Sequence, residues 1–109
     1  MAAAFGLVNE GKVEVTEYSP LRYLINNLNV SKGNSTAVAY LQELSRRGDV
    51  RKALLPVLST GTKDEKLGLI RALGPNADPE TVEALQTLTK DPDPDVSIAA
   101  ARNQTVKAR

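Results

Sequence analysis

Capping residues followed directly by proline recur along this chain and constrain its fold more than any other feature. The three pairs are Ser19-Pro20, Asp78-Pro79 and Asp93-Pro94. A Ser or Asp side chain accepts hydrogen bonds from the free N–H groups of a first helical turn. Proline fits the next position because its missing N–H would have no partner there. Each pair therefore predicts the start of a short helix.

Apolar residues recur at helical spacing after these starts. Behind Pro20, for example, apolar residues follow at i, i+3, i+4 and i+7, which is one face of a helix. Thr62 and Glu65 have the spacing of a capping box, and Pro56 should kink or shorten its helix. The pattern predicts about six short helices, at 20–29, 35–47, 50–59, 63–73, 79–90 and from 94 onward. Nothing clearly strand-like follows residue 18, so the predicted fold class is all-α.

Residues 1–18 have a different pattern from the rest of the chain. Gly6 and Gly11 weaken any long helix, and "KVEVTEY" alternates as an extended segment does. We expect an irregular N-terminal arm or cap over 1–18, with at most a short helix, and a helical repeat domain over 19–109. The arm has enough apolar residues to cover an open end of that domain, namely Phe5, Leu7, Val8, Val13 and Val15.

The helical segments repeat. Leu73 aligns on Leu44 with a step of 29 residues, and Leu69 aligns on Ala100 with a step of 31. A unit of two helices and about 30 residues therefore recurs from residue 35. Such units bury their apolar faces by stacking on one another, which predicts an α-solenoid of antiparallel helix pairs.

The segment 62–103 resembles the short HEAT-like repeats of the phycobilisome-lyase type. It has Leu73-Gly74 at the end of one helix, the turn "DPE" at 78–80, and "DPD" at 91–93 before Val96. The resemblance implies an α-solenoid that acts as a scaffold, an adaptor or, in a minority of cases, a chromophore lyase. The family usually places Arg after the Val that opens each first helix, whereas this chain has Lys66 and Ser97 there. We therefore expect charge-assisted bonds between repeats to be weak.

Two short motifs imitate functional sites. Asp91, Asp93 and Asp95 have the spacing of the first calcium ligands of an EF-hand, but the later glycine and glutamate positions of that loop are Val96 and Arg102. We interpret these aspartates as helix caps. The tripeptide at 47–49, "RGD", matches an integrin-binding sequence. We interpret it as a helix end, a left-handed C-cap glycine and the N-cap of the next helix.

Composition argues against most catalytic chemistry. The chain has no histidine and no cysteine, so the commonest general base, thiol nucleophile and transition-metal ligands are missing. We expect no enzymatic activity, no cofactor and no metal. The net charge of +1 and the four aromatic residues argue against nucleic acid. The chain also has no secretory signal pattern and no run of about 18 apolar residues, so we expect a cytoplasmic protein without membrane segments.

These observations favour a protein-binding or scaffold module that binds a protein or peptide partner on the concave face, and we expect a monomer. The second helices of successive pairs, at 20–29, 50–59 and 79–90, should line that face. The outward residues predicted to contact a partner are Arg22, Tyr23, Asn26, Arg51, Lys52, Glu83 and Gln86. Two alternatives stay open: a chromophore-lyase-like subunit, and the terminal structural fragment of a longer repeat protein.

Overall fold

The computed structural model describes the backbone of residues 1–107 and the side chains of residues 1–102. Within that part of the chain there are seven α-helices, two 3-10 turns and no strand, so the all-α prediction is confirmed. The α-helices are α1 (Ala2–Asn9), α2 (Pro20–Asn26), α3 (Asn34–Leu44), α4 (Gly48–Thr60), α5 (Lys63–Leu73), α6 (Pro79–Leu88) and α7 (Pro94–Lys107). The 3-10 turns are η1 (Asn27–Asn29) and η2 (Gly74–Asn76).

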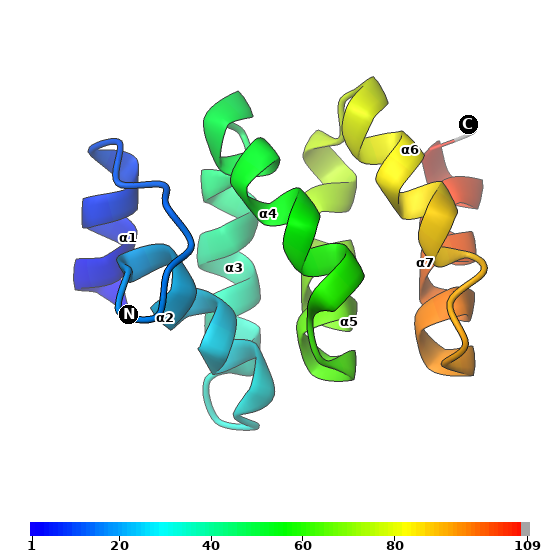
Figure 1. Ribbon diagram of the computed structural model, residues 1–109, viewed down its shortest axis with the longest axis horizontal. Coiled ribbons are helices and arrows are strands. Elements are labelled where there is room, and N and C mark those ends of the chain that lie inside the picture. The colour runs from blue at the N-terminus through cyan, green and yellow to red at the C-terminus, as the bar shows by residue number, and fades with distance from the viewer. Residues whose placement is uncertain (108–109) are drawn as a thin grey trace.

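The helices form two layers. In one layer α1, α3, α5 and α7 contact one another in succession, side by side along the 34 Å length of the molecule (Figure 1). The other helices cross in front of them in that view: α2 packs on α1 and α3, α4 on α5, and α6 on α7. Helices α4 and α6 also contact each other, so they form one continuous surface of the front layer.

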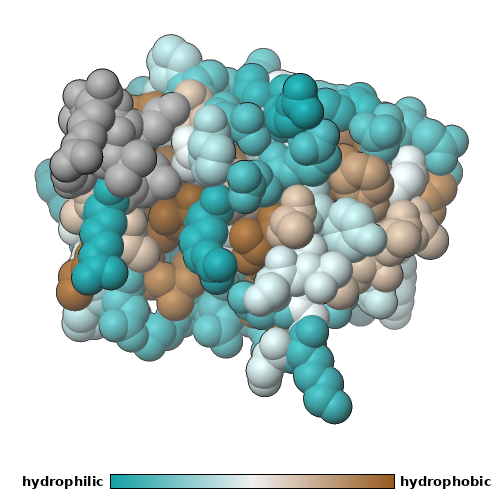
Figure 2. All heavy atoms as spheres, turned by 180° about the vertical axis from the view of Figure 1, so that it is seen from behind, coloured by the Kyte–Doolittle hydropathy of each residue, from teal (hydrophilic) through white to brown (hydrophobic). Residues whose placement is uncertain are grey.

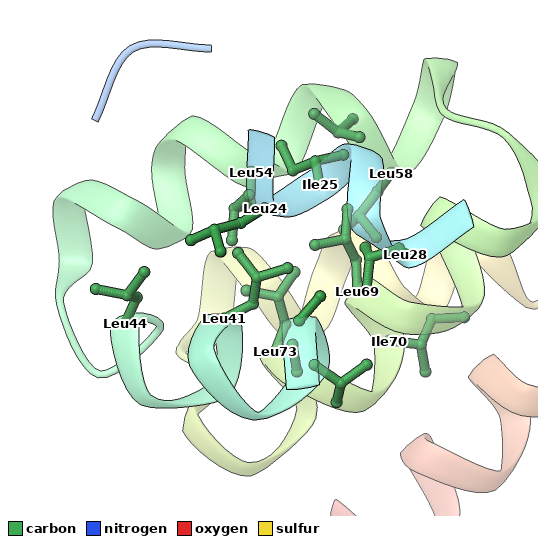
Figure 3. Close-up of a cluster of buried hydrophobic side chains, with 14 of the residues drawn as sticks. Leu24, Ile25, Leu28, Leu41, Leu44, Leu54, Leu58, Leu69, Ile70 and Leu73 are labelled. Atoms are coloured by element: carbon green, nitrogen blue, oxygen red, sulfur yellow. The ribbon is translucent and has the colours of Figure 1, made fainter. Parts of the chain in front are cut away.

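Aliphatic side chains fill the space between the layers. Figure 3 shows leucines of α2, α3, α4 and α5 converging on one cluster. Leu24, Leu41, Leu54 and Leu69 are all fully buried. The four apolar residues predicted to form one face behind Pro20 are all buried, whereas Leu67 of α5 and Val82 of α6 are half-buried. The core is therefore formed by the helical faces that the sequence pattern identifies.

Four side-chain caps fix the helix starts at the predicted residues. Ser19 Oγ accepts a hydrogen bond from the N–H of Arg22 at 3.2 Å, and Thr62 forms a complete capping box with Glu65. Asp78 accepts from the N–H of Thr81 at 2.9 Å, and Asp93 accepts from the N–H of Asp95 at 2.9 Å. These bonds satisfy N–H groups that would otherwise have no partner.

The junction between α3 and α4 differs from the prediction. Helix α3 ends at Leu44, and α4 begins at Gly48 with Arg47 as its N-cap, so Asp49 lies in the first turn. Gly48 is not left-handed, since Gly11 is the one described residue with a positive φ. The guanidinium of Arg47 binds the Asp49 carboxylate at 3.0 Å, and Asp49 also accepts from the N–H of Val50. The tripeptide therefore forms a local ion pair instead of two successive caps.

Helix α4 continues through Pro56 to Thr60, so this proline does not shorten it. Pro56 is exposed, so the Lys52 carbonyl that it leaves without a helical partner can meet water. The Pro56 carbonyl itself accepts a hydrogen bond from the Thr60 hydroxyl at 3.1 Å.

The N-terminal segment contains one short helix followed by a non-helical stretch. Residues 2–9 form α1, which packs against α2 and α3, and residues 10–18 are not helical. Ala4 and Val8 are buried, and the Phe5 ring lies 5.1 Å from that of Tyr40 on α3. The arm therefore contributes directly to the core at one end of the two layers.

Candidate interaction surface

Two of the seven residues predicted to contact a partner form ion pairs within the chain, and Arg22 is the first. Its guanidinium lies 3.3 Å from the carboxylate of Glu65, which is only 2% exposed. The side-chain amide of Asn29 donates to the same carboxylate at 2.8 Å, and Thr62 Oγ1 donates to Asn29 at 2.6 Å. This cluster of polar side chains fastens α2 and η1 to the start of α5.

Arg51 is the second of these residues. It donates to Asp78 at 3.0 Å and to the carbonyls of Ser45 and Arg46 at 2.9 and 3.2 Å. The guanidinium thus joins the end of α3 to the starts of α4 and α6. The pKa of Asp78 falls to about 2, because the side chain and N–H of Thr81 and then the Arg51 guanidinium favour the ionised carboxylate.

Lysines make further links between successive helix pairs. Lys66 binds Asp91 at 2.8 Å, and Lys63 binds Asp95 at 2.6 Å. The hydrogen bond from Lys66 lowers the pKa of the Asp91 carboxyl, and the hydrogen bond to Asp95 raises the pKa of Lys63. Lys66 therefore does form a charge-assisted bond between successive helix pairs, because Asp91 lies within reach of its single ammonium group.

The aspartates at 91–95 are used by these lysines and by the backbone. Asp91 accepts from the N–H of Asp93 at 2.9 Å, and Asp93 caps α7. The three carboxylates therefore each have a partner from within the chain. Among the described residues, no group of three acidic side chains is placed to hold a metal ion.

A groove of about 530 Å³ opens between α4 and α6, in the front layer of Figure 1. The groove has an apolar floor formed by Leu55, Leu58, Ala84 and Leu88. Three charged side chains also line the groove: Lys52 on α4, and Glu80 and Glu83 on α6. No ion pair involves any of these three side chains within the described part of the chain.

The remaining predicted residues fall into two places. Lys52 and Glu83 line the α4–α6 groove, and Gln86 lines an adjoining hollow that shares Glu83 with it. Tyr23 and Asn26 lie in a separate hollow beside α2, and Tyr23 is 52% exposed. The structure thus brings together only part of the predicted set.

Sequence reasoning missed several residues of these hollows. Glu80, Leu55 and Ala84 line the groove but were not among the residues predicted to contact a partner. Tyr18 was not singled out, although an aromatic residue directly before the Ser19 cap must lie in a turn outside the helix.

The opposite layer has a different surface. In Figure 2, where α1, α3, α5 and α7 face the viewer, brown hydrophobic residues are separated by long hydrophilic side chains.

In the described part of the chain, no helix combines the length and apolarity needed to cross a bilayer. Comparison of the chain with models of protein families, with curated proteins and with solved structures found no match.

Proposed function

We propose that this protein is a non-enzymatic binding module that holds a segment of a partner protein in the α4–α6 groove. The proposal includes a short α-solenoid of HEAT-like helix pairs as the supporting fold. Two layers of helices, in which alternate helices contact one another in succession, are what such a stack requires. Surfaces of this kind bind peptides or partner domains across neighbouring repeats.

The groove itself is the observation that supports the proposal. A partly exposed apolar floor beside charged side chains is the usual composition of a peptide-binding groove. Glu80 and Glu83 lie on the same helix and have no cationic partner among the described residues. The matching partner segment therefore has apolar side chains for the floor and a Lys or Arg for the two carboxylates.

Nothing in the geometry supports the chromophore-lyase alternative over this one. The groove contains carboxylates, a lysine and hydroxyls, but the chain has no cysteine or histidine to form or break a covalent bond there. A binding role needs only the contacts that these side chains can make, and it needs no catalytic step.

Selection from a library of random displayed peptides tests the proposal on the purified chain. Recovered peptides should combine apolar residues with Lys or Arg. Thr87→Arg should then raise the Kd about tenfold, because a long cation would occupy the groove and repel the basic partner. The matched control is Thr36→Arg, another exposed helical threonine, which lies on α3 and should leave the Kd within about twofold.

Two results would contradict the proposal. One is the recovery of acidic peptides without apolar residues. The other is an equal loss of binding in the Thr36→Arg and Thr87→Arg variants, because these two positions lie on different layers of the molecule.

A further inference from the structure

Two hollows meet at the tyrosines near the α1–α2 end of the molecule. An apolar hollow of about 390 Å³ is lined by Ala3, Leu7 and Pro20 together with both Tyr18 and Tyr23. A polar hollow of about 430 Å³ is lined by Glu17, Asn26 and the same two tyrosines. The aromatic pair therefore separates an apolar space from one that carries a carboxylate and an amide.

Tyr18 is held in an exposed position by an ordered turn. Its side chain is 91% exposed. The flanking residues are fixed, because Ser19 donates its N–H to the Thr16 carbonyl at 3.1 Å and its hydroxyl to the same carbonyl at 3.0 Å. Ser19 Oγ also accepts from the N–H of Thr16 at 3.1 Å, and Ser19 itself is buried. Because the backbone of this turn is already ordered, a partner that binds Tyr18 does not have to order it.

The electrostatics of the polar hollow favour a cation. Among the described residues, those that line the polar hollow include no Lys and no Arg. Glu17 forms no ion pair within the described residues. The faces of tyrosine rings attract cations through their quadrupole, and a nearby carboxylate adds to that attraction. The Asn26 side chain supplies a further hydrogen-bonding group.

We propose that this end of the molecule binds an Arg or Lys side chain of a partner protein between Tyr18, Tyr23 and Glu17. An apolar residue next to that cation enters the hollow lined by Leu7 and Pro20. This site is separate from the α4–α6 groove and does not depend on the function proposed for it.

Titration of the 15N-labelled protein with two short peptides tests the proposal. The probe is acetyl-Gly-Leu-Arg-Gly-amide, and its control carries citrulline in place of arginine, which has nearly the same shape without the charge. The arginine peptide should shift amide signals between residues 17 and 26. The citrulline peptide should bind about two- to fivefold more weakly, the factor expected for a cation over exposed aromatic rings.

Single substitutions locate the interaction. Tyr18→Leu and Glu17→Gln should each weaken binding of the arginine peptide about two- to fivefold, and neither residue is part of the core. The matched control is Glu14→Gln, an exposed carboxylate on the same segment that lines neither hollow, and it should leave binding unchanged.

Three outcomes would overturn this proposal. Equal binding of the two peptides would show that charge is not recognised. Shifts confined to residues 80–88 would place the arginine in the α4–α6 groove instead. Shifts at 17–26 that appear on concentrating the protein alone would show that the aromatic surface binds a second copy of this chain.

Discussion

The Nε atom of Arg51 donates a 3.0 Å hydrogen bond to Oδ2 of Asp78, and this bond joins α4 to α6. The same carboxylate caps α6 through its bond with the N–H of Thr81. One aspartate therefore fixes the start of its own helix and the position of the neighbouring one. Because α4 and α6 form the two walls of the proposed binding groove, this pair also sets the width of the groove at one end.

Replacing Asp78 should give a pH-dependent loss of stability. The folded-state pKa of about 2 lies below the ordinary value of 3.8, so the stabilisation is complete above about pH 5 and is lost as the pH falls from about 4 to 2. Asp78→Asn keeps a good N-cap but removes the charge. Since the side chain is 36% exposed, solvent screening limits the loss in free energy of unfolding to about 1 kcal/mol at pH 6.

Urea denaturation of both proteins between pH 2 and pH 6 measures this effect. The difference between wild type and Asp78→Asn should shrink as the pH approaches 2, because the wild-type carboxylate becomes protonated there. A difference that stays constant over this range would contradict the assigned charge interaction.

The buried carboxylate of Glu65 gives a second prediction. Glu65→Gln keeps the size of the side chain but removes the charge that holds Arg22 and accepts from Asn29. We expect the free energy of unfolding to fall by about 1.5 kcal/mol, as is typical for hydrogen bonds to charged groups. Glu43→Gln is the matched control, because Glu43 pairs with Arg46 on the exposed surface and should cost less than about 0.5 kcal/mol. Similar losses in the two variants would argue against a structural role for Glu65.

Gly68 allows close packing between α5 and η1. A Cβ atom at this position would lie 2.6 Å from Cδ2 and 3.0 Å from Cδ1 of Leu28, which is itself buried. Gly68→Ala should therefore lower the free energy of unfolding by about 1–3 kcal/mol, even though alanine favours helix by about 1 kcal/mol.

Gly6 is the matched control for this substitution. It lies in α1, and a Cβ atom there would have nothing within 4 Å. Gly6→Ala should raise the free energy of unfolding by about 0.5–1 kcal/mol. Thermal denaturation followed by circular dichroism measures both variants, and equal signs of the two effects would refute the packing argument.

The helix starts could be predicted from the sequence because a capping bond is local. Ser19, Thr62 and Asp78 each bond to a group three residues further along the chain, so the relevant residues are visible together. The junction at Gly48 could not be predicted in the same way. There the Asp49 carboxylate could either cap α4 or pair with Arg47, and the sequence pattern fits both roles. In the structure it pairs with Arg47.

The candidate surface was less predictable because it depends on distant partners. Arg51 and Tyr23 both occupy outward positions by helical spacing alone. Asp78, which is 27 residues away, binds Arg51, whereas Tyr23 keeps about half of its surface exposed. The position of a residue on its helix therefore predicts whether its side chain points away from the neighbouring layer. It does not predict whether another helix pair supplies an ion-pair partner.

Helix α1 leads to the last prediction, which concerns the end of the two layers. Val8, one of the apolar residues expected to cover the open end, is fully buried in α1. Val8→Ala should lower the free energy of unfolding by about 2 kcal/mol, from lost burial and the cavity that remains. Leu7→Ala is its control, because Leu7 is 38% exposed and should cost less than 1 kcal/mol, an order-of-magnitude expectation for partial burial. Deleting residues 1–15 should cost a few kcal/mol, and an unchanged melting temperature after that deletion would show that α1 does not stabilise the rest of the chain.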